Sequence, residues 1–316
     1  MSPARILTVG PDDDDIRLDR WFRRHFPALG HGHLEKLLRT GQIRVDGGRA
    51  RASMRIEAGR AVRIPPGLAE EYSRPERRAP VSPSDAEFLR SRVLHRDDEA
   101  IVIDKPAGLA VQGGSKVKSS VDAMLDALRF EAGERPRLVH RLDKDTSGVL
   151  ALARSRKAAA SLVAAFREGR VEKQYWALVS GVPQRESGVV DLALAKAPAL
   201  GGGESVQAGA AGAKRARTAW EVVAEARRVA WLSLRPETGR THQIRVHCRA
   251  LGTPIVGDGK YGADAPRIDG PPPAGRLMLH ARRLVLPRSH GPPVAVTAPL
   301  DAAMRAQWAF WGFDES

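Results

Sequence analysis

The sequence predicts an α+β protein in two parts. A small α/β domain of two short helices and a hairpin precedes a larger domain with a mainly antiparallel mixed sheet. In the first 66 residues, helical apolar spacing gives way to short strand patterns separated by tight turns. Further along, strand patterns outnumber helical ones, and many connections are short enough for hairpins. We expect a front domain at 15–66, a linker rich in Pro, Ser and charge at 67–88, and the large domain at 89–303.

Apolar side chains recur at helical spacing twice in the front domain. Residues 18–26 form one apolar helix face, and a leucine cluster at 34–38 forms a second. The stretch "GQIRVDGGRAR" then predicts a strand, a tight turn at Asp46-Gly47-Gly48 and a second strand. A further strand, "GRAVRIP", ends at Pro65. The positions expected to be buried are Leu18, Trp21, Phe22, Phe26, Leu34, Leu37 and Leu38.

The front domain also concentrates positive charge. Residues 15–66 hold twelve Lys/Arg and five Asp/Glu, a net +7 out of +14 for all 316 residues. A genome that favours Arg would also make a protein basic, but it would not gather half the excess in about one sixth of the chain. The clustering on the polar helix faces favours a polyanionic partner. The cations expected to bind this polyanion are Arg20, Arg23, Arg24, Lys36, Arg39 and Arg44.

The larger domain has strand patterns interrupted by two helices. The first helix, 155–169, has Ser155 as N-cap and ends at Gly169; the second, 241–251, begins at Thr241 as cap. The Gly/Ala-rich residues 195–216 have no pattern and predict a mobile surface loop. The expected strands are 100–108, 148–154, 172–181, 218–226 and 229–236.

Several classes of protein are excluded by what the sequence lacks. A single cysteine, Cys248, rules out an internal disulfide and a multi-thiolate metal site. His242 and His247 are five residues apart on different helix faces, which does not suit zinc. The sequence has no P-loop, no G-x-S-x-G, no signal peptide and no apolar run of membrane length. We expect a cytoplasmic protein without metal, cofactor or membrane partner.

The stretch "RLVHRLDKDTSGVLALARS" (137–155) carries an unusual cluster of charges directly before an apolar strand. Asp143 has two interpretations, a turn residue bonded to the local backbone or a catalytic carboxylate. On the 241–251 helix, His242, Arg245 and Arg249 share one face, which is either a solvated stripe or part of a site. Taken one at a time, these patterns leave both alternatives open.

Five motifs in order resemble the RluA-type family of RNA pseudouridine synthases. They are "IDKPAG", "RLVHRLDKDTSGVLALARS", "EKQYWALVSG", "RPETGRTHQIRVHCRALGTPIVGDGKYG" and "RLMLHARRL", which together span roughly 90–300. The front segments "LDRWFRRHF", "HLEKLLRTGQIRVDG" and "GRAVRIP" resemble an S4 RNA-binding domain. The combination is most similar to the RluC-like branch, whose members modify uridines of 23S ribosomal RNA. The resemblance implies an isomerase that needs no cofactor.

The resemblance also implies roles for individual residues. Asp143 is the catalytic carboxylate, acting either as a nucleophile or as the base that removes a sugar proton. Arg245 supplies the cation that keeps it ionised, and Tyr175 stacks on the uracil. Arg141 fills the space that the flipped uridine leaves in the RNA. The expected partner of this monomer is 23S rRNA or a pre-ribosomal particle. The alternatives are another rRNA site, a tRNA, or a catalytically idle ribosome-assembly factor.

Overall fold

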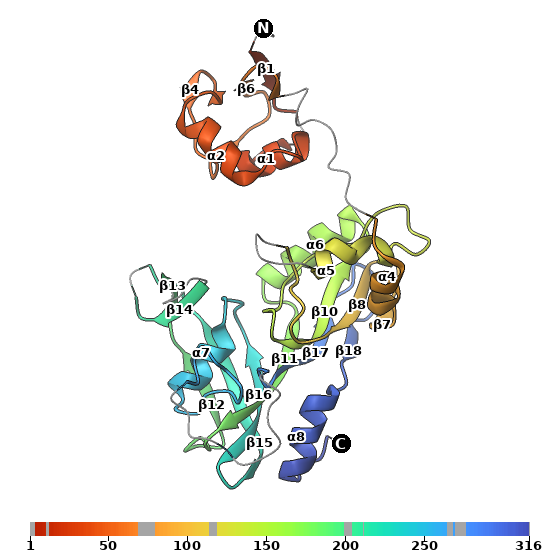
Figure 1. Ribbon diagram of the computed structural model, residues 1–316, viewed down its shortest axis with the longest axis vertical. Coiled ribbons are helices and arrows are strands. Elements are labelled where there is room, and N and C mark those ends of the chain that lie inside the picture. The colour runs from red at the N-terminus through yellow and green to blue at the C-terminus, as the bar shows by residue number, and fades with distance from the viewer. Residues whose placement is uncertain are drawn as a thin grey trace. The chain divides into compact units, whose positions relative to one another are not determined.

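The computed structural model describes residues 4–10, 13–68, 80–113, 119–198, 204–210, 212–263, 268 and 276–315. Contacts between Cα atoms divide the chain into two units, Met1–Pro80 and Val81–Ser316 (Figure 1). Each unit has its own apolar core, as separate domains do.

The first unit packs two helices against short strands. The residues expected in its core are all nearly inaccessible, with Leu18 at 0% and Trp21 at 1% exposure. Asp46 and Gly47 both have positive φ, as a two-residue hairpin turn requires, so this predicted turn is confirmed. Strands β1, β6, β3 and β4 form one sheet in that order, and β2 pairs with β5. The elements are β1 (Arg5–Thr8), β2 (Ile16–Arg17), α1 (Leu18–His25), α2 (His31–Arg39), β3 (Arg44–Val45), β4 (Gly48–Arg49), β5 (Arg55–Ile56) and β6 (Ala61–Ile64).

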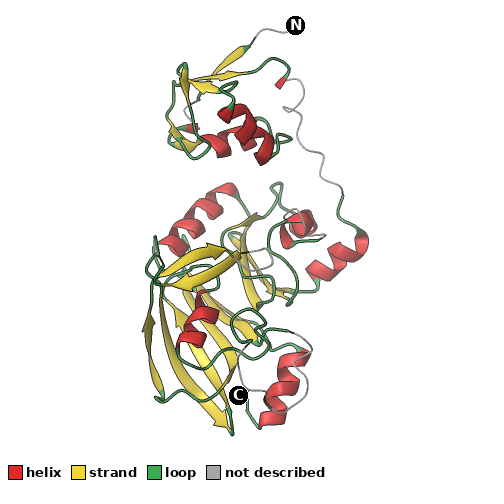
Figure 2. Ribbon diagram, turned by 60° about the vertical axis from the view of Figure 1, so that its left-hand side comes forward, coloured by secondary structure: helices red, strands yellow, loops and turns green. Residues whose placement is uncertain are grey.

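The second unit is built on one large sheet, drawn in yellow in Figure 2. This sheet has ten strands in the order β12-β15-β16-β11-β17-β10-β8-β7, with β18 beside β17 and β9 beside β10. Among the described residues, β10 and β17 form its one parallel pair. The predicted α+β fold with a mainly antiparallel mixed sheet is confirmed. The strands are β7 (Val93–Arg96), β8 (Ala100–Lys105), β9 (Arg137–Leu138), β10 (Ser147–Ala153), β11 (Glu172–Ser180), β12 (Ser187–Asp191), β15 (Arg217–Ala226), β16 (Val229–Pro236), β17 (Leu279–Leu286) and β18 (Val294–Thr297).

Helices cover the sheet of the second unit. Helix α6 begins as expected, because the Ser155 hydroxyl accepts a hydrogen bond from the N–H of Ala158, and Gly169 follows its end with positive φ. Helix α4 occupies the last residues of the predicted linker. Helix α8 extends beyond the predicted boundary at 303, and its Trp308 is buried against Trp231. The helices are α4 (Pro83–Arg90), α5 (Val121–Met124), the short 3-10 helix η2 (Leu125–Leu128), α6 (Arg156–Arg167), α7 (Gln243–Ala250) and α8 (Ala302–Trp311).

Two predictions about irregular segments are wrong. Much of the expected loop at 195–216 is a hairpin of β13 (Leu194–Pro198) and β14 (Glu204–Ala208). Its Leu194 and Val206 pack on Val246 of α7, so alternate side chains are buried despite the small residues around them. Residues 199–203 and 211 lie outside the described part. The cap of α7 is His242 in a left-handed conformation (φ 52°), and Thr241 precedes it.

The parallel pairing of β10 with β17 depends on one glycine. Gly148 has a φ of 105°, and a Cβ at this position would lie 2.2 Å from the carbonyl oxygen of Ala281. No other residue type fits so close to the neighbouring backbone. Gly148 therefore belongs to the strand that follows the charged stretch, and it lets the two central strands meet beside the site.

Candidate active site

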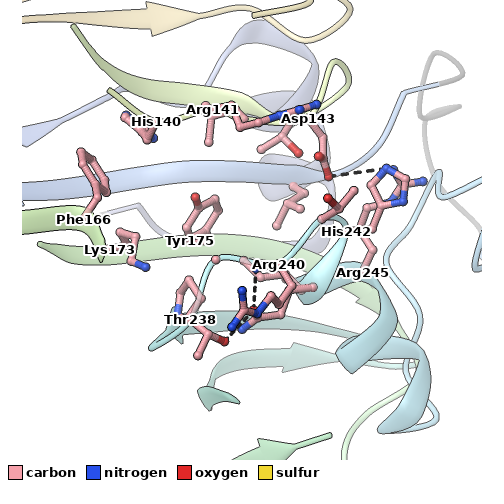
Figure 3. Close-up of a pocket in the computed structure, with 18 of the residues that line it drawn as sticks. His140, Arg141, Asp143, Phe166, Lys173, Tyr175, Thr238, Arg240, His242 and Arg245 are labelled. Atoms are coloured by element: carbon pink, nitrogen blue, oxygen red, sulfur yellow. Dashed lines mark hydrogen bonds and ion pairs between the residues drawn. The ribbon is translucent and has the colours of Figure 1, made fainter. Parts of the chain in front are cut away.

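A cavity of about 550 Å³ lies at the ends of the central strands of the second unit. Five segments line it: the loop before β10, the end of α6, the start of β11, residues 236–245 leading into α7, and Leu279 at the start of β17. The four residues singled out in this unit from the sequence, Arg141, Asp143, Tyr175 and Arg245, all line this cavity (Figure 3). Their catalytic roles remain predictions.

The Asp143 loop is anchored on both sides of the carboxylate. Leu142 is 5% and Thr146 2% exposed, whereas the side chain of Asp143 is 22% exposed, and all three line the cavity. The carbonyl oxygen of Lys144 accepts hydrogen bonds from the backbone N–H of Gly108 (2.9 Å) and from Nζ of Lys105 (3.0 Å). The charged residues before β10 therefore lie on a turn whose backbone is held by two hydrogen bonds.

Lys105 is a fully buried cation that holds this turn. Its Nζ also donates to the carbonyl oxygens of Pro106 (2.9 Å) and Leu109 (2.8 Å). Burial lowers the pKa of Lys105 to about 7, although Asp145 and Asp143 partly offset that effect. The lysine therefore ties the end of β8 to the Asp143 loop through the Lys144 carbonyl, and its two other acceptors fix the segment that follows β8.

Tyr175 stands on β11, where a bulge between Gln174 and Tyr175 shifts the register with β17. Burial raises the pKa of Tyr175, and the nearby Asp143 carboxylate raises it further. The side chain is therefore a neutral phenol at physiological pH. Lys173, two residues earlier on the same strand, lines the same cavity, and burial lowers its pKa. The strand thus presents a ring and a cation on one face.

Arg245 is buried on α7 and makes a bidentate ion pair with Asp258. Its Nε and Nη2 donate to the two carboxylate oxygens at 2.8 and 2.7 Å. Burial lowers the pKa of Arg245, but the hydrogen bonds and charge of Asp258 outweigh this, and Asp143 adds to the rise. Both hydrogen bonds of this guanidinium edge therefore go to Asp258. Arg245 acts on Asp143 through its charge.

His242 lies beside Asp143, although the sequence predictions did not assign it to the active site. Its Nε2 lies 4.0 Å from Oδ2 of Asp143 (Figure 3). The residue has positive φ, which is uncommon for a side chain other than glycine and often marks functional positions. The sequence placed His242 in a cationic stripe with Arg245 and Arg249. This stripe was a weak signal for an active site, because a solvated helix face has the same pattern, and Arg249 is indeed exposed.

His140 is a second residue that the sequence left unassigned. Its ring stacks on Phe166 with centroids 4.3 Å apart, and its Nε2 accepts a hydrogen bond from the N–H of Ala151 at 2.8 Å. Burial lowers the pKa of His140 to about 3, and the charge of Lys173 lowers it as well. This histidine is therefore neutral and forms part of the cavity wall.

The segment from Pro236 to His242 is shaped by one buried side chain. Oε1 of Gln243 accepts hydrogen bonds from the hydroxyl of Thr238 (2.7 Å) and the N–H of Arg240 (3.0 Å). Its Nε2 donates to the hydroxyl of Thr218 at 2.9 Å. The conformation of this segment brings Arg240 to the cavity edge as a further cation that the sequence did not single out.

The six cations expected to bind RNA in the first unit differ in how free they are. Arg20, Arg23, Lys36 and Arg39 are exposed on α1 and α2. Arg24 pairs with Asp13, and Arg44 donates to the carbonyl oxygens of Gly41 (3.2 Å) and Gly47 (3.0 Å). The surfaces of α1 and α2 therefore remain basic, whereas Arg24 and Arg44 bond to other groups of the first unit.

Comparison with known proteins identifies the family. Residues 99–250 match the family model described as RNA pseudouridylate synthase. The chain is 44% identical over 217 residues to an uncharacterized RNA pseudouridine synthase of Zymomonas mobilis, covering 68% of this chain and 96% of that protein. The chain belongs to the RNA pseudouridine synthase family. The predicted family is thereby confirmed.

Two further relatives extend the comparison for this synthase. It is 35% identical over 306 residues to ribosomal large subunit pseudouridine synthase C of Salmonella typhimurium, covering 96% of this chain and 95% of that protein. The solved structure of human RNA pseudouridylate synthase domain containing 4 superposes with a TM-score of 0.59 at 29% identity, covering 71% of this chain and 94% of that one. The fold and the family thus agree.

The described residues contain no group of three His, Cys, Asp or Glu side chains that could hold a metal ion. In the same residues no helix is long and apolar enough to cross a membrane. The cavity offers the synthase the Asp143 carboxylate, a neutral phenol ring and several cations, and its other carboxylate, Glu237, pairs with Arg217. Such an arrangement suits a bond cleavage at a sugar next to a flat, polar base.

Proposed function

We propose that this synthase converts specific uridines of 23S ribosomal RNA to pseudouridine, with Asp143 as the catalytic carboxylate. The observation that carries the proposal is the position of Asp143 in a cavity that also holds Tyr175, Arg141 and Arg245. The RNA target is supported by relatives named ribosomal large subunit pseudouridine synthase C, which match over nearly the whole chain.

The reaction is an isomerisation that balances without a co-reactant. The N1–C1′ bond of uridine breaks, the uracil turns, and a C5–C1′ bond forms while a proton leaves C5 and N1 gains one. Asp143 serves either by attacking C1′ or by removing a sugar proton, and both routes start from the ionised carboxylate.

Tyr175 supplies a flat surface for the uracil ring. Aromatic rings stack on bases whatever their sequence context, and the high pKa of this phenol means that its hydroxyl donates a hydrogen bond. The cavity volume falls within the range of small-molecule sites, so one nucleotide can enter it. That entry requires the uridine to be flipped out of its helix or loop.

Arg141 and the first unit handle the rest of the RNA. Arg141 is exposed beside Asp143, and its planar guanidinium suits stacking in the gap that a flipped base leaves. The exposed cations of α1 and α2 suit an S4-type grip on phosphates, which positions RNA without reading its sequence. Work on naked rRNA or on an assembling particle, a cytoplasmic location and a monomeric state remain predictions.

The proposal is tested by a pseudouridine map of ribosomal and transfer RNA from cells with and without this gene, rescued by wild type or by Asp143→Asn. We expect certain 23S uridines to lose the modification and only wild type to restore it. In a purified assay, Asp143→Asn should slow pseudouridine formation by at least roughly 10⁴-fold with RNA affinity retained. Loss confined to tRNA would overturn the 23S target, and full rescue by Asp143→Asn would overturn the catalytic role.

A further inference from the structure

The ring of His242 connects the Asp143 carboxylate to the hairpin of β13 and β14. On one side, Nε2 of His242 faces Oδ2 of Asp143 at 4.0 Å. On the other side, Nδ1 lies 2.7 Å from the hydroxyl oxygen of Tyr261. That same oxygen is 3.0 Å from the backbone nitrogen of Val206 in β14. Three consecutive contacts thus join a buried backbone amide to the reacting group.

The directions of these hydrogen bonds follow from the two groups that bond to the Tyr261 oxygen, the Val206 amide and the Ser205 hydroxyl, because two donors fill both lone pairs of that oxygen. A backbone N–H can only donate, so the Tyr261 oxygen accepts from Val206. Burial raises the pKa of Tyr261, which keeps its proton on the hydroxyl. That proton is then available for Nδ1 of His242. When Nδ1 accepts, a neutral imidazole carries its own hydrogen on Nε2, the atom that faces Asp143.

Burial and the neighbouring charges together favour the neutral form of the His242 ring. Burial lowers the pKa of His242, and although the negative charge of Asp143 opposes this, the net shift is downward. The side chain is only 11% exposed, so water contributes little to stabilising a cation. The charged groups facing the ring are Asp143 from the loop before β10, Arg245 from α7, and Asp258 and Lys260 from the turn that also carries Tyr261.

We propose that His242 is a positioning residue for Asp143, and that Tyr261, fixed by the amide of Val206, sets the tautomer in which His242 does so. The Nε2–H of His242 donates to the carboxylate and orients one of its oxygens toward C1′ of the bound uridine. A distance of 4.0 Å is longer than a hydrogen bond, but catalytic hydrogen bonds commonly tighten when substrate binds. This inference rests on the proposed function, because Asp143 must be the reacting group.

The backbone of His242 supports this role. A φ of 52° costs a non-glycine residue free energy, and the structure keeps it where the ring meets Asp143 and Tyr261 at once. The inference also explains why the hairpin lies against α7, since its buried Val206 amide orients a hydroxyl two contacts away from the carboxylate.

The tautomer can be measured directly in the intact protein. Uniform ¹⁵N labelling of its nine histidines distinguishes a protonated from an unprotonated ring nitrogen, and His242→Gln identifies the His242 signals by their absence. We expect a neutral ring with hydrogen on Nε2 at pH 7. In Tyr261→Phe the preference should weaken, and signals of both tautomers should appear. A ring protonated on Nδ1, or on both nitrogens, would overturn the proposal.

Single-turnover kinetics on an rRNA fragment test the consequence. His242→Phe, which cannot donate, should slow pseudouridine formation roughly 10- to 100-fold with little change in RNA affinity, because it removes a hydrogen bond to a charged group. His242→Gln, whose amide can donate, should recover much of the rate. The exposed His290→Phe is the matched control and should match wild type.

The two proposals fail in different ways. An unchanged rate in His242→Phe, beside an inactive Asp143→Asn, would overturn the role of His242 and leave the proposed function standing. A wild-type protein that forms no pseudouridine in any rRNA or tRNA would overturn the proposed function. Equal losses in His242→Gln and His242→Phe would show that ring packing matters and donation does not, which also overturns the inference.

Discussion

The positive charges of the two units are held in opposite ways. In the first unit, Arg20, Arg23 and Lys36 stand exposed on α1 and α2. In the second, Arg245 and Lys105 are buried, and each is bound by fixed acceptors: a carboxylate for the arginine and three backbone oxygens for the lysine. The first set can meet phosphates from many directions, whereas the second set fixes the protein's own geometry.

The difference follows from the surrounding medium. Exposed charges interact through water and salt, so each contributes a small and roughly independent amount. A buried charge depends on one or a few partners, and the loss of a single partner leaves it uncompensated. Substitutions in the first unit should therefore act gradually on RNA binding, and substitutions beside the cavity should have large effects on stability or rate.

The largest expected effect on stability comes from breaking the buried pair. Asp258→Asn should reduce the free energy of unfolding by about 3–5 kcal/mol, because Arg245 loses its counter-charge in a buried position. The matched control is Asp191→Asn, which breaks the exposed pairs with Arg215 and Arg217 and should cost much less. Urea unfolding followed by tryptophan fluorescence measures both free energies of unfolding. The signal reports mainly on the second unit, which carries both substitutions, because only Trp21 of the six tryptophans lies in the first unit. Equal costs would contradict the comparison.

The pH dependence of that pair has a definite sign. Burial raises the pKa of Asp258, but the hydrogen bonds and charge of Arg245 outweigh it, so the folded-state pKa lies below the unfolded value of about 3.9. The pair therefore contributes its stability above about pH 3.9 and loses it as pH falls through the folded pKa. Wild type should lose this contribution on acidification, and Asp258→Asn should not.

A smaller effect is expected at His140. His140→Leu should cost about 1–3 kcal/mol, because the N–H of Ala151 loses its acceptor inside the sheet. The folded-state pKa of about 3 lies below the unfolded value of about 6.5, so the unfolded chain binds the proton first. Stability should therefore fall as pH drops from about 6.5 toward 3 in wild type and less so in the variant. The exposed His290→Leu serves as control, and an equal loss there would refute the role of this hydrogen bond.

The smallest effect per residue is expected in the first unit. Replacing Arg23, Lys36 and Arg39 together by Gln should lower the salt dependence of rRNA binding by about 0.7–0.9 in log–log slope for each phosphate that is no longer neutralised. The single-turnover rate at saturating RNA should not change, since the cavity is untouched. Three exposed arginines of the second unit, Arg185, Arg227 and Arg228, replaced in the same way form the control. An unchanged slope in the first variant would refute an RNA grip by this unit.

Local patterns in the sequence were enough for most elements. Alternating or helical apolar spacing placed α1, α2, α6, β8, β10, β11, β15 and β16, because burial of one face follows directly from that spacing. The hairpin of β13 and β14 was not predicted, because the many Gly and Ala residues around it obscure the alternation of apolar and polar side chains. Contacts with distant residues such as Tyr261 decide which of its side chains are buried. The cap of α7 was also misassigned, because a left-handed histidine is held by tertiary contacts.

The sequence by itself determined the two-part organisation, the basic front unit and, through ordered motifs, the family, and it carries the prediction that Asp143 and Tyr175 are catalytic. Only the tertiary structure decided which charges meet: Arg245 with Asp258, Lys105 with the Lys144 carbonyl, and His242 with Asp143 and Tyr261. The physical reason is that periodicity encodes whether a side chain is buried. Its polar partner depends on how distant segments pack, and in a buried site that partner sets the protonation state.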